Sequence, residues 1–184
     1  MRKLRDHRNG ISLEMDYSIE DGGSIHHQEM EPKHSMPYLK QLRVVAAENN
    51  KPMLDKVVLL LRPDFEVVAT AADGNAALEM IELLKPDIAI LDISMPNLTG
   101  IEVAAALKRK GSDVKAVILT VHDDPDYVRA ALNAGAAAYV LKSHMAVDLK
   151  AALLAVSNGN IFLSSSCVMT SDGSGESNRD PSRN

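Results

Sequence analysis

The chain has 184 residues, of which 46% are hydrophobic, 24% are charged and only 3% are aromatic. This length suggests one domain with room for extensions at its ends. The net charge of −5 argues against a surface for nucleic acid or anionic membranes, because both need clustered Lys and Arg. The single cysteine, Cys167, excludes an internal disulfide framework. No apolar run approaches the roughly 18 residues of a membrane span, and no secretory signal is evident, so we expect a cytoplasmic protein without membrane contact.

Both ends of the chain differ in composition from its middle. Residues 1–40 are polar, mixed in charge and without sustained periodicity, a composition that predicts a mostly disordered extension. Residues 164–184 are rich in Ser, Gly, Asn and Asp and are predicted to form a flexible polar tail. The part of the chain expected to fold is therefore 41–163.

Within 41–163, short apolar runs alternate with stretches of helical periodicity. Pro63 and Pro86 end two helical stretches, Asp73 is a candidate N-cap, and Asp124 and Pro125 suit the start of another helix. The expected strands are 42–47, 65–70, 87–91, 114–120 and 137–141, and the expected helices are about 52–62, 73–84, 100–110, 123–133 and 146–157.

The apolar runs lack the strict alternation of strands that have one face in water, so both faces of the predicted sheet should be covered. Strands that alternate with helices then predict an α/β fold, because right-handed crossovers place the strands parallel to one another. The expected architecture is a doubly wound (βα)5 domain with a five-stranded parallel sheet and helices on both sides.

Asp92 follows one of the buried strands, in the segment ILDISMPNLTG at 90–100. In an open α/β sheet, ligands and chemistry collect at the carboxyl ends of the strands. A carboxylate held there is a candidate nucleophile or metal ligand. The alternative is an aspartate that only caps a turn, and the segment alone leaves both interpretations open.

Polar side chains also end the neighbouring predicted strands. Glu48 and Asn49 follow the first strand, Thr120 ends the fourth, and Lys142 follows the fifth. Together with Asp92, they suggest phosphoryl chemistry. Carboxylate and amide oxygens suit Mg²⁺, and a lysine and a metal would neutralise charge on a transferring phosphoryl group. An unpaired lysine after an apolar strand would be costly, and Asp92 is its simplest partner.

Four features combine into a resemblance to a known family: the acid after the first strand, ILDISMPNLTG, VILTVHDD and NAGAAAYVLKS. The chain resembles, over about 41–163, the receiver domain of bacterial two-component response regulators of the NarL/FixJ type. This resemblance implies a flavodoxin-like sheet with the strand order 2-1-3-4-5. It also implies that Asp92 is the phosphoacceptor in phosphorelay signal transduction, loaded by a sensor histidine kinase or a phosphotransfer protein, and that Thr120 and Lys142 contact the phosphoryl group.

Three further roles follow from the resemblance. Tyr139 matches the aromatic switch residue, although a lone tyrosine at the edge of a core is the plain alternative. Ser94 and His122, each two residues after a site residue, match positions that tune dephosphorylation. For His122, an ordinary loop residue is an equally good interpretation.

The resemblance also implies a Mg²⁺ site formed by Glu48, Asn49, Asp92 and the backbone carbonyl of Ser94. Receivers usually carry two acids after the first strand, whereas the second position here is Asn49. An amide oxygen can ligate Mg²⁺ but adds no full charge, so weakened metal binding is expected. The alternative function is therefore a pseudo-receiver, a binding module with weak or absent phosphorylation.

A phosphohydrolase that uses Asp92 as its nucleophile is a third candidate. Such enzymes commonly carry a second acid two residues later, where this chain has Ser94. We therefore expect a switch rather than an enzyme, with at most slow autodephosphorylation.

The sequence after 163 shows no helical pattern, whereas NarL-type regulators carry a helix-turn-helix output domain there. We therefore expect a stand-alone receiver that signals by protein–protein contact through the 123–157 face, without direct DNA binding. The kinase, the output partner and the oligomeric state, a homodimer included, are left open by the sequence.

Overall fold

The computed structural model describes residues 4–6, 13–15 and 41–165, which fall into two compact units divided after Leu39. In the first unit, β1 (Leu4–Asp6) pairs antiparallel with β2 (Leu13–Met15). The rest of the extension predicted at 1–40, and the tail from 166 onward, lie outside the described residues.

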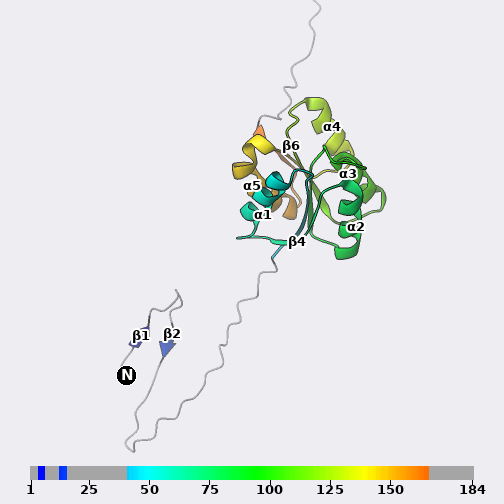
Figure 1. Ribbon diagram of the computed structural model, residues 1–184. Helices are drawn as coiled ribbons and strands as arrows, with labels where there is room; N and C mark the ends of the chain where they lie inside the picture. The colour runs from blue at the N-terminus through cyan, green and yellow to red at the C-terminus, as the bar shows by residue number, and fades with distance from the viewer. Residues whose placement is uncertain (1–3, 7–12, 16–40, 166–184) are drawn as a thin grey trace, which may run out of the picture. The chain divides into compact units, whose positions relative to one another are not determined.

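The second unit is a parallel sheet of six strands with helices packed on it (Figure 1). The order across the sheet is β4-β3-β5-β6-β7-β8. The strands are β3 (Arg43–Ala47), β4 (Glu66–Ala71), β5 (Ile88–Leu91), β6 (Lys115–Thr120), β7 (Ala138–Leu141) and β8 (Phe162–Leu163). The helices are α1 (Lys51–Leu61), α2 (Gly74–Leu84), α3 (Gly100–Arg109), α4 (Pro125–Asn133), the 3-10 turn η1 (Lys142–His144) and α5 (Met145–Ser157).

The helices form two layers because successive strand residues point to opposite faces of the sheet. Val44 and Ala46 of β3 belong to a core shared with α1 and α5, whereas Val45 and Ala47 belong to a core shared with α2, α3 and α4. Figure 1 shows these two groups of helices on either side of the strands. Both faces are covered, as the uninterrupted apolar runs predicted. In the described ranges, no helix has the length and apolar character needed to cross a membrane.

In the second unit, the five predicted strands lie in the predicted order, and β8 was not predicted. Strands β1 and β2, which lie within the extension expected to be mostly disordered, were not predicted either. The two residues of β8, Phe162 and Leu163, are too few to show a periodic pattern, and they form a strand because β7 offers a free edge beside them. Packing also continues one residue past the predicted boundary at 163. Ser164 is fully buried, and its N–H donates to the carbonyl of Tyr139 at 2.9 Å.

The Ser164 hydroxyl joins β7 to α5. It accepts the N–H of Leu141 at 3.2 Å and donates to Asp148 Oδ2 at 2.6 Å. We expect Ser164→Ala to lower the free energy of unfolding by about 1–3 kcal/mol, because a buried N–H loses its acceptor. Urea denaturation at an unchanged m-value measures this loss.

Ser157→Ala is the matched control for that change. Its hydroxyl also donates a hydrogen bond, to the Leu154 carbonyl at 2.8 Å, but the residue is exposed. Water can replace this bond, so we expect a change within about 0.5 kcal/mol. Equal urea midpoints for the two variants would contradict the assigned role of Ser164.

Two helix N-termini border the loop that follows β5. Asp73 caps α2 as predicted, and hydrogen bonds from the Ala76 N–H and then from the Asn97 side chain hold the pKa of Asp73 below its usual value. The N–H of Gly74 donates to the carbonyl of Pro96 at 3.1 Å. Thr99 caps α3 through a reciprocal capping box with Glu102. The 92–99 loop is thus held by the start of α2 at Pro96 and Asn97 and by the start of α3 at Thr99.

Candidate functional site

Four predicted residues end neighbouring strands at the same edge of the sheet. Glu48 follows β3, Asp92 follows β5, Thr120 ends β6, and Lys142 follows β7. The strand order places these strands side by side. The Asp92 N–H donates to the Ala47 carbonyl at 3.0 Å, which continues the β3–β5 ladder past its last paired residues. The convergence expected at the carboxyl edge of the sheet is confirmed.

Lys142 joins the two carboxylates of this site. Its Nζ lies 2.6 Å from Glu48 Oε2 and 3.0 Å from Asp92 Oδ1. The side chains of Glu48 and Asp92 are only 3% exposed, and that of Lys142 is 10% exposed. The predicted pairing of Lys142 with Asp92 is therefore present. The second partner, Glu48, was not predicted, because sequence spacing does not show how far a side chain reaches.

The carboxylates are not fully satisfied by this ion pair. Glu48 Oε1 accepts the N–H of Asn50 at 3.0 Å. Glu48 Oε2 and Asp92 Oδ1 are buried and accept no hydrogen bond from the described residues, so the Lys142 charge is their counterpart. Buried oxygens without donors are costly unless a cation faces them. The two carboxylates and one ammonium leave one net negative charge in a nearly closed site.

Glu48 and Asp92 offer carboxylate oxygens, the type of donor atom that Mg²⁺ and Ca²⁺ prefer. The donor chemistry of these two side chains therefore fits a hard divalent cation. The number of charges is low: no group of three or more His, Cys, Asp or Glu side chains in the described part of the chain is arranged to hold a metal. Asn49 has an exposed side chain, and no hydrogen bond within 41–165 joins it to the cluster.

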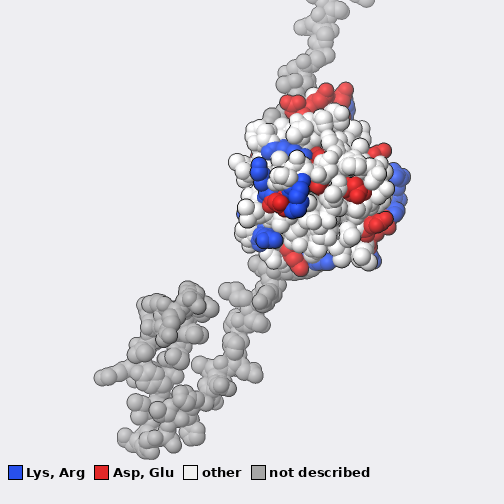
Figure 2. Space-filling model, in the orientation of Figure 1, with Lys and Arg blue, Asp and Glu red and all other residues white. Residues whose placement is uncertain are grey.

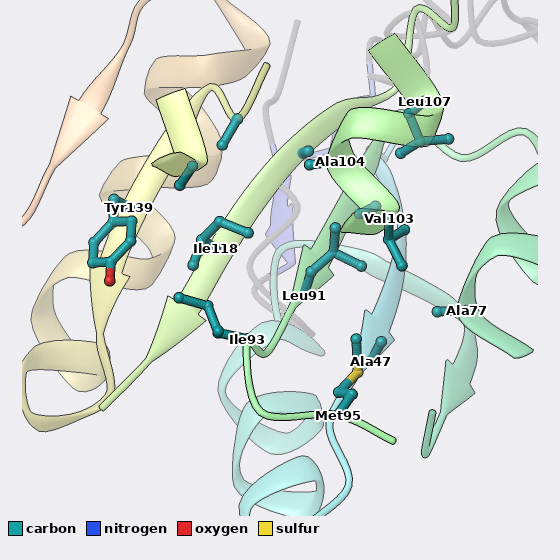
Figure 3. Close-up of a cluster of buried hydrophobic side chains, with 14 of the residues drawn as sticks. Ala47, Ala77, Leu91, Ile93, Met95, Val103, Ala104, Leu107, Ile118 and Tyr139 are labelled. Carbon is teal, nitrogen blue, oxygen red and sulfur yellow. The ribbon is translucent and has the colours of Figure 1, made fainter. Parts of the chain in front are cut away.

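Thr120 and Tyr139 connect the site to the core beneath it. Both side chains are completely buried. The Thr120 hydroxyl accepts the N–H of His122 at 3.3 Å, and the Tyr139 hydroxyl donates to the carbonyl of His122 at 2.8 Å. Figure 3 shows Tyr139 beside Ile118, its register partner on β6. Tyr139 is thus a core residue whose hydroxyl also holds the loop after Thr120. Its role as a switch residue stays a prediction.

Ser94 and His122 lie together at the surface of the site. Ser94 is exposed and His122 is half-buried, and Ser94 Oγ lies 3.3 Å from His122 Nε2. One face of the imidazole is covered by the Tyr127 ring, which stacks on it at a centroid distance of 4.4 Å and an interplanar angle of 17°. The sequence contains no signal for this stack, which depends on the turn of chain between β6 and α4.

The chain matches the family model described as response regulator receiver domain over residues 44–154. It is 39% identical over 108 residues to the transcriptional regulatory protein DegU of Brevibacillus brevis, covering 59% of this chain and 46% of that protein. It is 35% identical over 136 residues to the probable transcriptional regulatory protein NarL of Mycobacterium tuberculosis strain H37Rv, covering 73% and 63%. The chain thus spans about half to two-thirds of the length of these curated relatives.

Solved structures with the same arrangement include the signal receiver domain of NarL from Mycobacterium tuberculosis. It matches with a TM-score of 0.63 and 34% identity, covering 65% of this chain and 98% of that one. The isolated REC domain of RcsB from Salmonella enterica serovar Typhimurium, solved in the presence of phosphomimetic BeF3⁻, matches with a TM-score of 0.64 and 26% identity, covering 69% and 96%.

Proposed function

Because the chain belongs to the response regulator receiver domain family of two-component systems, we propose that Asp92 accepts a phosphoryl group and that the domain acts as a phosphorylation-controlled switch. The observation that carries this proposal is the buried triad at the strand ends. Lys142 faces both Glu48 Oε2 and Asp92 Oδ1, and neither oxygen accepts a hydrogen bond within the described ranges. The family supports a sensor histidine kinase or a phosphotransfer protein as the donor.

In this proposal, Asp92 attacks phosphorus through a carboxylate oxygen, and the donor leaves with the electron pair of the broken bond. The Lys142 ammonium and the Thr120 hydroxyl stabilise the negative charge on the phosphoryl oxygens. Glu48, Asn49, Asp92 and the Ser94 carbonyl would hold a divalent cation, which supplies further charge neutralisation when bound. Burial of the triad strengthens each of these interactions, because charges interact more strongly away from water.

The switch would work through the contacts of His122. A phosphoryl group that draws the Thr120 hydroxyl toward Asp92 competes with the 3.3 Å contact to the His122 N–H. The Tyr139 hydroxyl holds the carbonyl of the same residue. Phosphorylation would therefore shift the balance between two packings of this loop.

The readout surface proposed for this switch is the 123–157 face, formed by α4, β7 and α5. It exposes the side chains of Tyr127, Val147 and Leu154. Asp123, Asp124 and Asp126 are also exposed, and Figure 2 shows acidic side chains gathered at the top of the view, over α4. Apolar groups bordered by charge suit contact with a protein partner.

Phosphorylation is tested by incubating the chain with acetyl phosphate and Mg²⁺ and then separating the products on a phosphate-affinity gel. We expect a slower-migrating species that is absent in Asp92→Ala. Absence of this species at saturating Mg²⁺ would favour the pseudo-receiver, and steady phosphate release without an accumulated phosphoprotein would favour an enzyme.

The pseudo-receiver is the second candidate function, and the exposed, uncharged Asn49 is the observation that favours it. We expect Asn49→Asp to raise the affinity for Mg²⁺ about tenfold, which corresponds to about 1.4 kcal/mol, because a full charge is added beside the site. Isothermal titration calorimetry with Mg²⁺ measures the change.

Asn50→Asp is the control for Asn49→Asp because it adds the same charge one residue away. The Asn50 side chain caps α1 by accepting the Met53 N–H at 3.0 Å, and aspartate can make the same cap. We expect a smaller gain in Mg²⁺ affinity from this variant. Equal affinities of Asn49→Asp and the unmodified chain would show that position 49 does not govern metal binding.

A further inference from the structure

We propose that Tyr127 is a positioning residue that holds the His122 ring across the entrance to Asp92 and thereby prolongs the lifetime of the aspartyl phosphate. This inference rests on the proposed function of Asp92. It concerns a residue outside the group formed by Glu48, Asp92, Thr120 and Lys142, because Tyr127 lies in the first turn of α4. The observations that carry it are the ring stack, the Ser94 contact and the exposure of Tyr127.

His122 is held at its backbone and at its side chain. Its N–H donates to the Thr120 hydroxyl and its carbonyl accepts from the Tyr139 hydroxyl. Its Nε2 lies 3.3 Å from Ser94 Oγ, and one face of its ring lies against Tyr127. The imidazole therefore has a defined position rather than the freedom of an ordinary loop side chain.

The position of the imidazole matters because its contact with Ser94 connects two loops of the site. Ser94 belongs to the loop after β5 and His122 to the loop after β6, and these two strands are neighbours. Asp92 lies at the end of β5. The Ser94–His122 contact thus joins the loop that begins at Asp92 to the loop that follows Thr120, and Asp92 itself is buried.

Core packing does not account for Tyr127. Its side chain is 39% exposed, and the residues by which α4 packs on the sheet are Val128 and Ala131. What the tyrosine contributes is a flat aromatic surface against His122. A stacked aromatic pair is stabilised by about 0.5–1.5 kcal/mol, which corresponds to a ratio of about 2- to 12-fold between the stacked and the unstacked imidazole.

Hydrolysis of the aspartyl phosphate needs a water molecule at phosphorus. The water oxygen forms the new P–O bond, the bond from phosphorus to the Asp92 oxygen breaks, and its electron pair stays on the Asp92 carboxylate. The water gives up one proton to solvent, so inorganic phosphate is released. Because Nε2 of His122 is engaged by Ser94, the held imidazole obstructs this water rather than activating it.

The decisive measurement is the lifetime of the phosphorylated 184-residue chain after removal of acetyl phosphate. We expect Tyr127→Ala to hydrolyse about 2- to 12-fold faster than the unmodified chain, and Tyr127→Phe to restore the long lifetime because phenylalanine keeps the stack. In a His122→Ala background, Tyr127→Ala should cause no further change, since there is no ring left to position. An unchanged lifetime in Tyr127→Ala, or acceleration that persists without His122, would overturn the proposal.

A spectroscopic readout separates this proposal from the proposed function. The Tyr127 ring should shift the His122 ring protons upfield in the NMR spectrum of the unphosphorylated chain. We expect that shift to vanish in Tyr127→Ala and to survive in Tyr127→Phe. If the chain accepts no phosphoryl group, the proposed function fails together with the effect on hydrolysis, while the shift still reports whether Tyr127 positions His122. Unshifted His122 protons in the unmodified chain would overturn the positioning role itself.

Discussion

Lys142→Met should destabilise the domain by about 3–5 kcal/mol, because the substitution leaves two buried carboxylates without their common counter-charge. Glu48 and Asp92 are each 3% exposed, so water cannot easily replace the ammonium. We also expect phosphorylation by acetyl phosphate to slow about 100-fold, the size of loss that follows removal of one electrostatic stabiliser from an active site. Urea denaturation and the time course of labelling measure the two effects.

Lys150→Met is the matched control for the effect on stability. Lys150 pairs with Asp64 at 2.6 Å, but both side chains are substantially exposed, at 35% and 54%. Exposed pairs contribute about 0–1 kcal/mol, so this variant should unfold near the midpoint of the unmodified chain. Similar losses in both variants would mean that burial of the triad does not govern the stability of the domain.

Gly100→Ala should have the second large effect. A Cβ at this position would lie 2.4 Å from the carbonyl oxygen of Asp92 and 3.1 Å from Leu91 Cβ. The Asp92 backbone cannot easily move away, because its N–H is bonded to Ala47 on the neighbouring strand. We expect a loss of about 3 kcal/mol or more in unfolding free energy, at the upper end of overpacking effects, together with slower phosphorylation as Asp92 is displaced.

Gly111→Ala separates this steric effect from the general cost of replacing glycine. Gly111 has a φ of +63°, and an added Cβ would meet no atom within 4 Å. Its replacement should cost only about 1–2 kcal/mol for the left-handed backbone, with no change in the labelling rate. Thermal or urea unfolding measures both variants. A smaller loss in Gly100→Ala than in Gly111→Ala would show that α3 can move away from Asp92.

Much of the fold was predictable because its signals are local. Apolar runs marked the five longer strands, and Asp73 and Asp124 capped the helices that the sequence assigned to them. The N-cap Thr99 and its partner Glu102 also follow a recognisable capping-box spacing, so the start of α3 carries a local signal as well. In contrast, β8 has only two residues, and its existence depends on an available strand edge rather than on its own pattern.

The candidate site was partly predictable for a related reason. In a parallel sheet, residues that end neighbouring strands must meet, so Asp92, Thr120 and Lys142 could be grouped once the strands were identified. The pairing of Lys142 with Glu48 could not be inferred in this way, since it depends on side-chain reach within a closed site. The exposure of the Asn49 side chain could not be inferred either, because a position after a strand end does not show whether the side chain points into the site.

The sequence by itself therefore determined the order of strands and helices and the polar residues that meet at one edge of the sheet, because periodicity, caps and strand ends are properties of neighbouring residues. Only the tertiary structure decided that Lys142 bridges two carboxylates, that Gly100 must leave room for the Asp92 carbonyl, and that Tyr127 stacks on His122. Each of these contacts joins segments whose separation is set by packing of the sheet, its loops and its helices, and no local pattern records that distance.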